Sequence, residues 1–266
     1  AALACAVWAP LAPSLVEALG LSGAIVGAIV GWLATALAPA CAEGPGDKDM
    51  SRATWLLLLA GLVGAGLAAA APRTDVDHPA KLNLIHLTDL DLGAAYYAAD
   101  APAGLAPEVA EAVPWDTPRP ILPWSARPLP IVRAEPSGRD GLTLTRDAVE
   151  PAGAVTRVHA TLRAPAGALA ALLVLPGDAV AAISVGGRPL DPATLRPGPS
   201  DTRIVTVFSP PAEGLPLTVD LRKPTPWQLV ALHPGLPAGS PASARPDTAV
   251  PYQNGDLTAV VRAVQP

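Results

Sequence analysis

Side chains of the kinds that bind metal ions gather in one stretch of this 266-residue chain. They are Asp75, Asp77, His78, His86, Asp89 and Asp91. A hydrolytic zinc site needs three protein ligands, an open position for water and a nearby general base, whereas calcium takes roughly six to eight oxygen ligands. The spacing here fits neither, and the chain has no HExxH motif, no HxD motif and no adjacent pair of glutamates. We interpret the stretch as a solvated linker over 73–80, followed by a strand and a polar turn.

Nucleophilic catalysis has no motif in this sequence either. The GxSxG sequence of a nucleophile elbow is absent, around Ser125, Ser184 and Ser209 as elsewhere. No motif ties His159 or His233 to a serine. The glycine pair at 186–187 lacks the further glycines and the following helix of a phosphate loop, so it predicts a hairpin turn. We therefore predict no catalytic residue, no metal ligand and no cofactor in this chain.

Charged residues are distributed unevenly along the chain. They make up 15% of all residues, below the usual share of about 25%, and residues 1–72 hold only six of them. The rest of the chain carries the other 35 charged residues and 28 of the 33 prolines. This division predicts an apolar membrane part followed by a proline-rich β part. A formal net charge of -5 without a Lys/Arg cluster excludes nucleic acid as a partner.

Residues 1–72 contain three apolar stretches of about the length that crosses a bilayer, which is roughly 20 residues. The stretches 20–41 and 54–72 are uncharged. The stretch 1–19 is interrupted by Pro10, Pro13 and Glu17, so it is expected to be a kinked or truncated span. We predict two to three transmembrane α-helices, with the lipid bilayer as a partner.

Small residues recur on the second expected span. Gly23, Gly27 and Gly31 lie four residues apart, which places them along one stripe of a helix where another backbone can approach closely. They are the candidate helix-packing residues, for contact with another span or with a second copy of the chain. Chance spacing in an alanine- and glycine-rich segment is the alternative. Cys5 and Cys41 are expected to be structural, because no histidine precedes residue 78 to act as a base.

From residue 81 onward the hydrophobic pattern changes to that of β-strands. KLNLIHLTD and AAYYAAD predict a hairpin around the turn 89–93, and only 105–113 fits a short helix. The segment 102–136 is expected to be a proline-rich connector pinned by Trp115 and Trp124. Further strands are expected at 142–145, 155–162, 170–175, 181–185, 203–208, 217–221, 228–232 and 257–263. The pattern predicts one all-β, antiparallel, sandwich-like domain over 81–266.

The order of the features matches a known arrangement. Expected membrane spans precede KLNLIHLTDLDLGAAYYAAD, a connector ending near ILPWSARPLP, a β domain and the tail GLPAGSPASARPDTAVPYQNGDLTAVVRAV. This order resembles the C-terminal end of the membrane-anchored aminopeptidase-type zinc metallopeptidases of the endoplasmic-reticulum metallopeptidase and vacuolar membrane protease group, in particular its bacterial members. The resemblance implies that a two-zinc peptidase domain, with an HxD motif and a Glu-Glu pair, lies upstream. It assigns no catalytic or zinc-binding role to any position of this sequence.

The resemblance implies that the chain is the membrane anchor and C-terminal accessory domain of a zinc-dependent exopeptidase. Zinc and peptide hydrolysis would belong to the absent upstream domain, which is then a partner of this chain. The resemblance also implies a bacterial inner membrane with the β domain on its non-cytoplasmic side. The alternative, from a different class, is a non-enzymatic, membrane-tethered β domain that binds a partner or the cell envelope. A third hypothesis is a complete enzyme that uses the cluster over 78–91.

Overall fold

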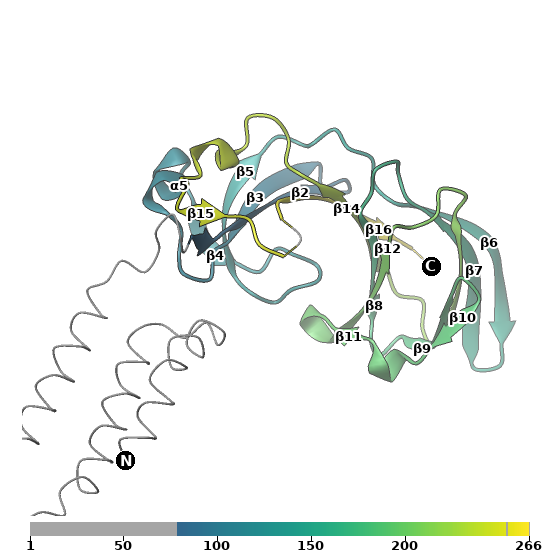
Figure 1. The fold of residues 1–266 in the computed structure, drawn as a ribbon. Coiled ribbons are helices and arrows are strands. Elements are labelled where there is room, and N and C mark those ends of the chain that lie inside the picture. Colours follow the sequence, from purple (N-terminus) through teal and green to yellow (C-terminus); the bar gives the residue numbers. More distant parts are fainter. Residues whose placement is uncertain (1–78, 254, 266) are drawn as a thin grey trace, which may run out of the picture. The chain divides into compact units, whose positions relative to one another are not determined.

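A computed structural model describes residues 79–253 and 255–265, which belong to one compact unit, Val76–Pro266. Two β-sheets dominate this unit (Figure 1). The larger sheet has nine strands, in the order β11-β12-β8-β14-β16-β2-β3-β5-β4. In that order they are β11 (Arg196–Pro197), β12 (Thr202–Phe208), β8 (Ala170–Pro176), β14 (Trp227–Pro234), β16 (Leu257–Val264), β2 (Asn83–Asp89), β3 (Ala94–Asp100), β5 (Leu129–Ala134) and β4 (Asp116–Arg119).

The smaller sheet has five strands, in the order β10-β9-β13-β7-β6. They are β10 (Arg188–Leu190), β9 (Val180–Val185), β13 (Leu215–Leu221), β7 (Val155–Arg163) and β6 (Thr143–Ala152). A two-stranded parallel pair joins β1 (Ala80–Lys81) to β15 (Ala249–Val250). The helical elements among the described residues are short: α5 (Pro107–Ala112) and the 3-10 turns η2 (Pro192–Thr194), η3 (Pro199–Asp201) and η4 (Pro241–Ala244).

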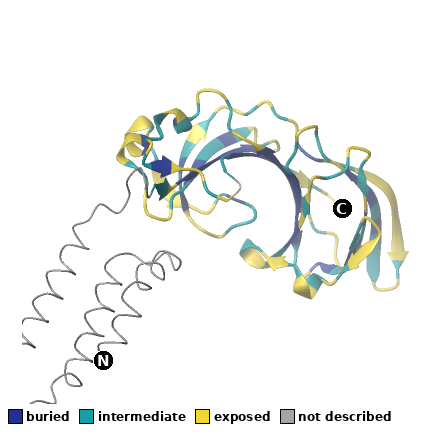
Figure 2. Ribbon diagram, viewed as in Figure 1, coloured by how far each residue is buried: buried dark blue, intermediate teal, exposed yellow. Residues whose placement is uncertain are grey.

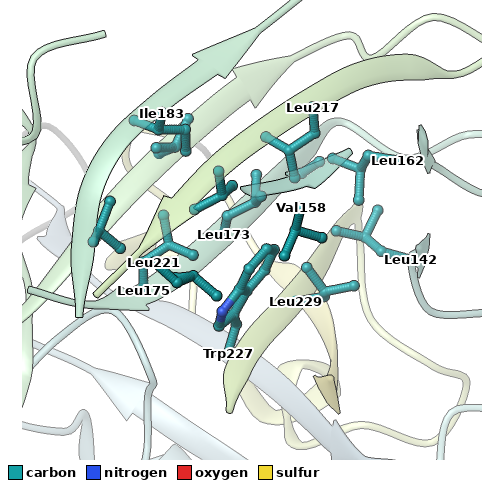
Figure 3. Packing of buried hydrophobic residues seen from close by; sticks show 14 of the residues in the cluster. Leu142, Val158, Leu162, Leu173, Leu175, Ile183, Leu217, Leu221, Trp227 and Leu229 are labelled. Atoms are coloured by element: carbon teal, nitrogen blue, oxygen red, sulfur yellow. The ribbon is translucent and has the colours of Figure 1, made fainter. Parts of the chain in front are cut away.

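The five-stranded sheet packs on one face of the nine-stranded sheet, which we call the sandwich face. Burial alternates along β7 and β13, as expected for strands with one covered and one open face. Leu173 on β8 and Leu229 on β14 meet Val158 and Leu217 from the smaller sheet (Figure 3). Trp227 lies in the same cluster and is 1% exposed. This is the core of a β-sandwich, as the sequence pattern predicts.

The nine-stranded sheet is also apolar on its other face, which we call the inner face. The residues of β8 are buried on both sides of the strand, a pattern of strands covered on both faces. On β8, Leu172 and Val174 belong to the inner-face cluster, and Leu122 from the segment after β4 packs there too. The Arg196 guanidinium on β11 donates a 2.8 Å hydrogen bond to the Trp124 carbonyl in that segment. The sheet therefore curls around its inner face, where Figure 2 shows a continuous band of buried residues.

A third apolar cluster covers the far end of the sandwich face, beyond the five-stranded sheet. Leu84 on β2 and Ala99 on β3 pack there against Val109 of α5. The helix begins at Pro107, whose missing N–H is tolerated in a first turn. The Trp115 indole N–H donates to the Val109 carbonyl over 2.9 Å and so fixes the chain that leaves the helix.

The expected fold class needs correction. The described part of the chain is β-rich, and none of its helices has both the length and the apolar composition to cross a membrane. The prediction of transmembrane α-helices as part of the fold is therefore wrong for the structure as described, and the expected spans 1–19, 20–41 and 54–72 lie outside the described residues. The sheets are not purely antiparallel either, because β16 pairs with β2, and β1 with β15, in parallel.

The proline-rich connector also differs from expectation. The segment 102–136 contains two strands, β4 and β5, and β5 is paired on both sides, with β3 and with β4. Leu129 and Ile131 of β5 are buried on the inner face. The free energy gained by this burial outweighs the strand-disfavouring effect of the two prolines beside them. The eight strands expected after residue 141 are present as β6, β7, β8, β9, β12, β13, β14 and β16, and α5 lies within 105–113.

We expect the sandwich core to dominate the stability of the domain. Leu173 is fully buried between the sheets, so Leu173→Ala should lower the free energy of unfolding of the 266-residue chain by about 3 kcal/mol, through lost transfer energy and a residual cavity. Leu92→Ala is the matched control, because Leu92 is 78% exposed; it should change the value by less than about 0.5 kcal/mol. Urea unfolding followed by tryptophan fluorescence measures both variants. Equal effects would contradict this packing.

Candidate functional site

The described residues of the stretch considered for metal binding have different partners. The Asp89 carboxylate accepts hydrogen bonds from the backbone N–H groups of Asp91 and Leu92, so it stabilises its own turn. Asp91 accepts from the backbone N–H of Ala263 on β16. His86 points into the domain and is fully buried. Over 79–253 and 255–265 no group of three potential ligand residues is placed to hold a metal ion, while Asp75, Asp77 and His78 lie outside the described residues.

Polar groups converge instead on the sandwich face of the nine-stranded sheet. Thr258 on β16 lies opposite His233 on β14 and opposite His86 on β2. His86 in turn lies opposite Tyr97 on β3, with the ring centroids 4.9 Å apart in an edge-to-face contact. Directly opposed residues share one face of a sheet. We call these four residues the polar row; its two histidines and its threonine are almost completely buried.

The polar row is covered by the segment 135–142, which joins β5 of the larger sheet to β6 of the smaller sheet. Nε2 of His86 lies 2.9 Å from the carbonyl oxygen of Glu135, and Nε2 of His233 lies 3.1 Å from that of Asp140. A carbonyl oxygen only accepts, so both rings carry a proton on Nε2. The two histidines therefore bind both ends of a six-residue stretch of backbone.

A threonine and a glycine complete the contact with this segment. The backbone N–H of Ser137 donates to the Thr88 hydroxyl over 3.2 Å, and that hydroxyl donates to the Ser137 side chain over 3.2 Å. Gly141 is buried against the sheet: a Cβ atom there would lie 3.0 Å from Leu90 Cδ1 and 3.3 Å from Val260 Cγ1. Only a residue without a side chain allows the backbone to come this close without displacing its neighbours.

Both buried histidines are held in the neutral form. Burial lowers the pKa of His86 below its usual value; the positive charge of Arg139 acts in the same direction, and the bond to the Glu135 carbonyl opposes them. Burial likewise lowers the pKa of His233, with Arg139 again adding to the effect, while the Asp140 carbonyl and carboxylate oppose it. At neutral pH the row therefore contains two uncharged imidazoles whose Nε2 atoms are occupied by backbone carbonyls.

The other residues considered for nucleophilic chemistry have different partners. His159 lies on the open face of β7, with Nδ1 3.1 Å from the Thr218 hydroxyl and Nε2 3.4 Å from a Glu150 carboxylate oxygen. Ser125 accepts from the backbone N–H of Arg127 in the segment after β4. Ser184 lies on β9, and Ser209 directly follows β12. The structure brings no serine of this set to a histidine.

The polar row is not predicted from the sequence, in which His86 and His233 lie in separate strands with no motif between them. The available signal was weak: each histidine, like Thr258, follows an apolar residue within a strand. The candidate helix-packing residues Gly23, Gly27 and Gly31 lie outside the described residues.

Comparison with known proteins gives no assignment, because no protein-family model and no curated protein matches the chain.

A second buried polar cluster fastens the C-terminal part of the chain. Arg245 donates to both carboxylate oxygens of Asp256 over 2.7 and 2.9 Å, and Asp256 also accepts from the backbone N–H of Leu84 at the start of β2. The two side chains are only 13% and 15% exposed. Beside them, the Asn83 side chain exchanges two hydrogen bonds with the backbone of Tyr252. The segment after η4 is thus tied to the first hairpin.

Removing one partner of this pair should be strongly destabilising. Asp256→Ala leaves the Arg245 charge largely buried and uncompensated, so we expect the free energy of unfolding to fall by about 3 kcal/mol or more. The matched control is Asp116→Ala, which removes an ion pair whose two side chains are each 58% exposed; the expected change is about 0–1 kcal/mol. Thermal and urea unfolding of the 266-residue variants provide the comparison. A loss at Asp256 no larger than that at Asp116 would contradict the buried geometry.

Proposed function

We propose that residues 79–265 form a non-catalytic accessory domain, whose role is to bind a partner rather than to transform a substrate. The observation that carries this proposal is how the domain uses its reactive side chains. His86 and His233 hold a backbone segment, Asp89 stabilises a turn, and Asp256 neutralises Arg245. Catalytic groups need a substrate within hydrogen-bond reach, whereas these groups are occupied by the protein itself.

The open face of the five-stranded sheet supports the same interpretation. Arg157 on β7 and Asp220 on β13 form two parallel hydrogen bonds of 2.7 and 2.8 Å. The bonds hold the pKa of Asp220 below its usual range. Thr161, further along β7, donates to the Asp147 carboxylate over 2.9 Å. These are cross-strand contacts of a kind that stabilises a sheet and orders its surface.

The proposal predicts that the 266-residue chain neither retains zinc nor hydrolyses peptides. Elemental analysis after dialysis should find far less than one zinc ion per chain, and short peptides should not be cleaved above the background of a buffer blank. The matched variants are His86→Ala and His159→Ala, one in the polar row and one on the open face. Stoichiometric zinc and peptide hydrolysis that are both lost in one of these variants would overturn a non-catalytic role.

A second candidate is more specific: the domain is the accessory part of a zinc-dependent exopeptidase. It is favoured by the order of segments that resembles that family, and by the way these segments fold together. The first hairpin, β2–β3, and the last strand, β16, are neighbours in one sheet. The segment KLNLIHLTDLDLGAAYYAAD and the C-terminal tail therefore belong to a single folded unit. An accessory domain that forms one structural module requires these segments to fold together.

The genomic sequence directly upstream of the codon for Ala1 distinguishes the two candidates. The exopeptidase hypothesis predicts an HxD motif, a Glu-Glu pair and further Asp and His ligands encoded in the same reading frame. An upstream frame that lacks these motifs would remove the exopeptidase hypothesis and leave the general accessory role in place.

A further inference from the structure

From the geometry of the polar row we infer that the segment 135–142 is an acid-released latch on the nine-stranded sheet. It stays docked while His86 and His233 are uncharged, and its middle part lifts from the sheet when the imidazoles take up protons. This latch is a conformational device and is independent of the accessory function proposed above.

The docked segment is held by few interactions, and the histidines supply two of them. Their Nε2 atoms bind the carbonyl oxygens of Glu135 and Asp140, and Thr88 binds Ser137 between these points. The segment otherwise exposes Glu135, Pro136, Gly138 and Asp140 to solvent. Because it buries little apolar surface between these points, its docking depends on the hydrogen bonds to the row.

A proton added to His86 finds only a weak partner in the docked state. On His86 the new donor, Nδ1–H, faces the Thr88 hydroxyl, whose oxygen lies 3.5 Å away, at the limit of hydrogen-bond length. That oxygen also accepts the Ser137 N–H, so a bond from Nδ1–H would be long and shared. Tyr97 presents its ring to the same imidazole, and Thr258 donates its hydroxyl to the Gly235 carbonyl over 2.7 Å. A buried charge without a compensating partner is strongly disfavoured, so the protonated state favours an open, hydrated arrangement.

The charges on the segment itself act mainly in the same direction. Arg139 lies near enough to lower the pKa of both histidines, so a protonated row repels the segment through this residue. Asp140 carries the opposing charge: its carboxylate favours protonated His233, but this charge has a smaller effect on the pKa of His233 than the charge of Arg139. Glu135 contacts His86 through its backbone carbonyl.

The sign of the pH dependence follows from the lowered pKa values. Above the ordinary histidine pKa of about 6.5 neither the docked nor the open state binds a proton at these rings, so docking is strongest there. As the pH falls below about 6.5, the imidazoles bind protons in the open state but not in the docked state, so docking weakens. This weakening ends when the pH falls below the lowered pKa that the imidazoles have in the docked state. Each histidine can raise the opening constant by at most about tenfold per pH unit in this window.

Hydrogen–deuterium exchange of the 266-residue chain, corrected for the intrinsic pH dependence of exchange, tests the latch. Between pH 7.5 and pH 5.5 we expect the opening constant of peptides covering 135–142 to rise by between about threefold and a hundredfold. Peptides covering β8 in the sandwich core should stay unchanged. The double variant His86→Gln and His233→Gln, which keeps an N–H donor at each position but cannot be protonated, should abolish the rise, whereas His159→Gln should retain it.

Three outcomes would overturn the latch: a pH-independent segment, a rise that persists in the double variant, or a rise that β8 shares equally and that therefore reports global unfolding. If the double variant does not fold, NMR titration of the wild-type imidazole C–H signals decides instead. Either histidine titrating at or above pH 6.5 while the segment stays docked would exclude the proposed coupling.

Discussion

Burial of the central strands of the nine-stranded sheet on both faces is the constraint on which the rest of this domain depends. A polar group on a strand covered from two sides is costly to bury unless the protein supplies its partner, because water cannot reach it. The inner face meets this requirement because its side chains are apolar. The sheet also curls around this face, so that Arg196 on β11 donates to the Trp124 carbonyl in the segment after β4. The sandwich face is too wide for the five-stranded sheet alone, so it needs additional covers.

Three covers share the sandwich face, and the polar row lies between two of them. The five-stranded sheet and the cluster around α5 are apolar, and the segment 135–142 bridges the strip that separates them. The row also fixes the pairing of the strands beneath it. A one-residue slip of β16 would replace Thr258 by an apolar neighbour opposite both histidines and turn the threonine to the inner face. Hydrogen bonding in the strip therefore supports the register that the apolar clusters also require.

Local patterns in the sequence predicted much of the β domain, but they could not predict its closure. Alternation found β7 and β13, and apolar runs found β8 and β14, because these signals lie within single strands. It missed β5, where prolines conceal the alternation of Leu129 and Ile131. Local patterns could not predict that β16 pairs in parallel with β2, for example at Leu257 opposite Ile85, because these strands lie far apart in the sequence. The polar row escaped for a related reason: its histidines bind backbone carbonyls, and a carbonyl leaves no signature in a sequence.

The arrangement of anchors explains why opening of the covering segment is a local event. At one end the segment continues from β5, whose Ile131 is buried on the inner face. At the other end Leu142 is fully buried in the sandwich core, and Gly141 lies against Val260. Apolar contacts at both ends do not depend on protonation, whereas the middle is held by imidazoles and hydroxyls. A segment with this distribution of contacts opens at its centre while both sheets stay folded, because local stability follows the buried apolar area. The two sheets then remain joined by the core while the polar row becomes accessible to water.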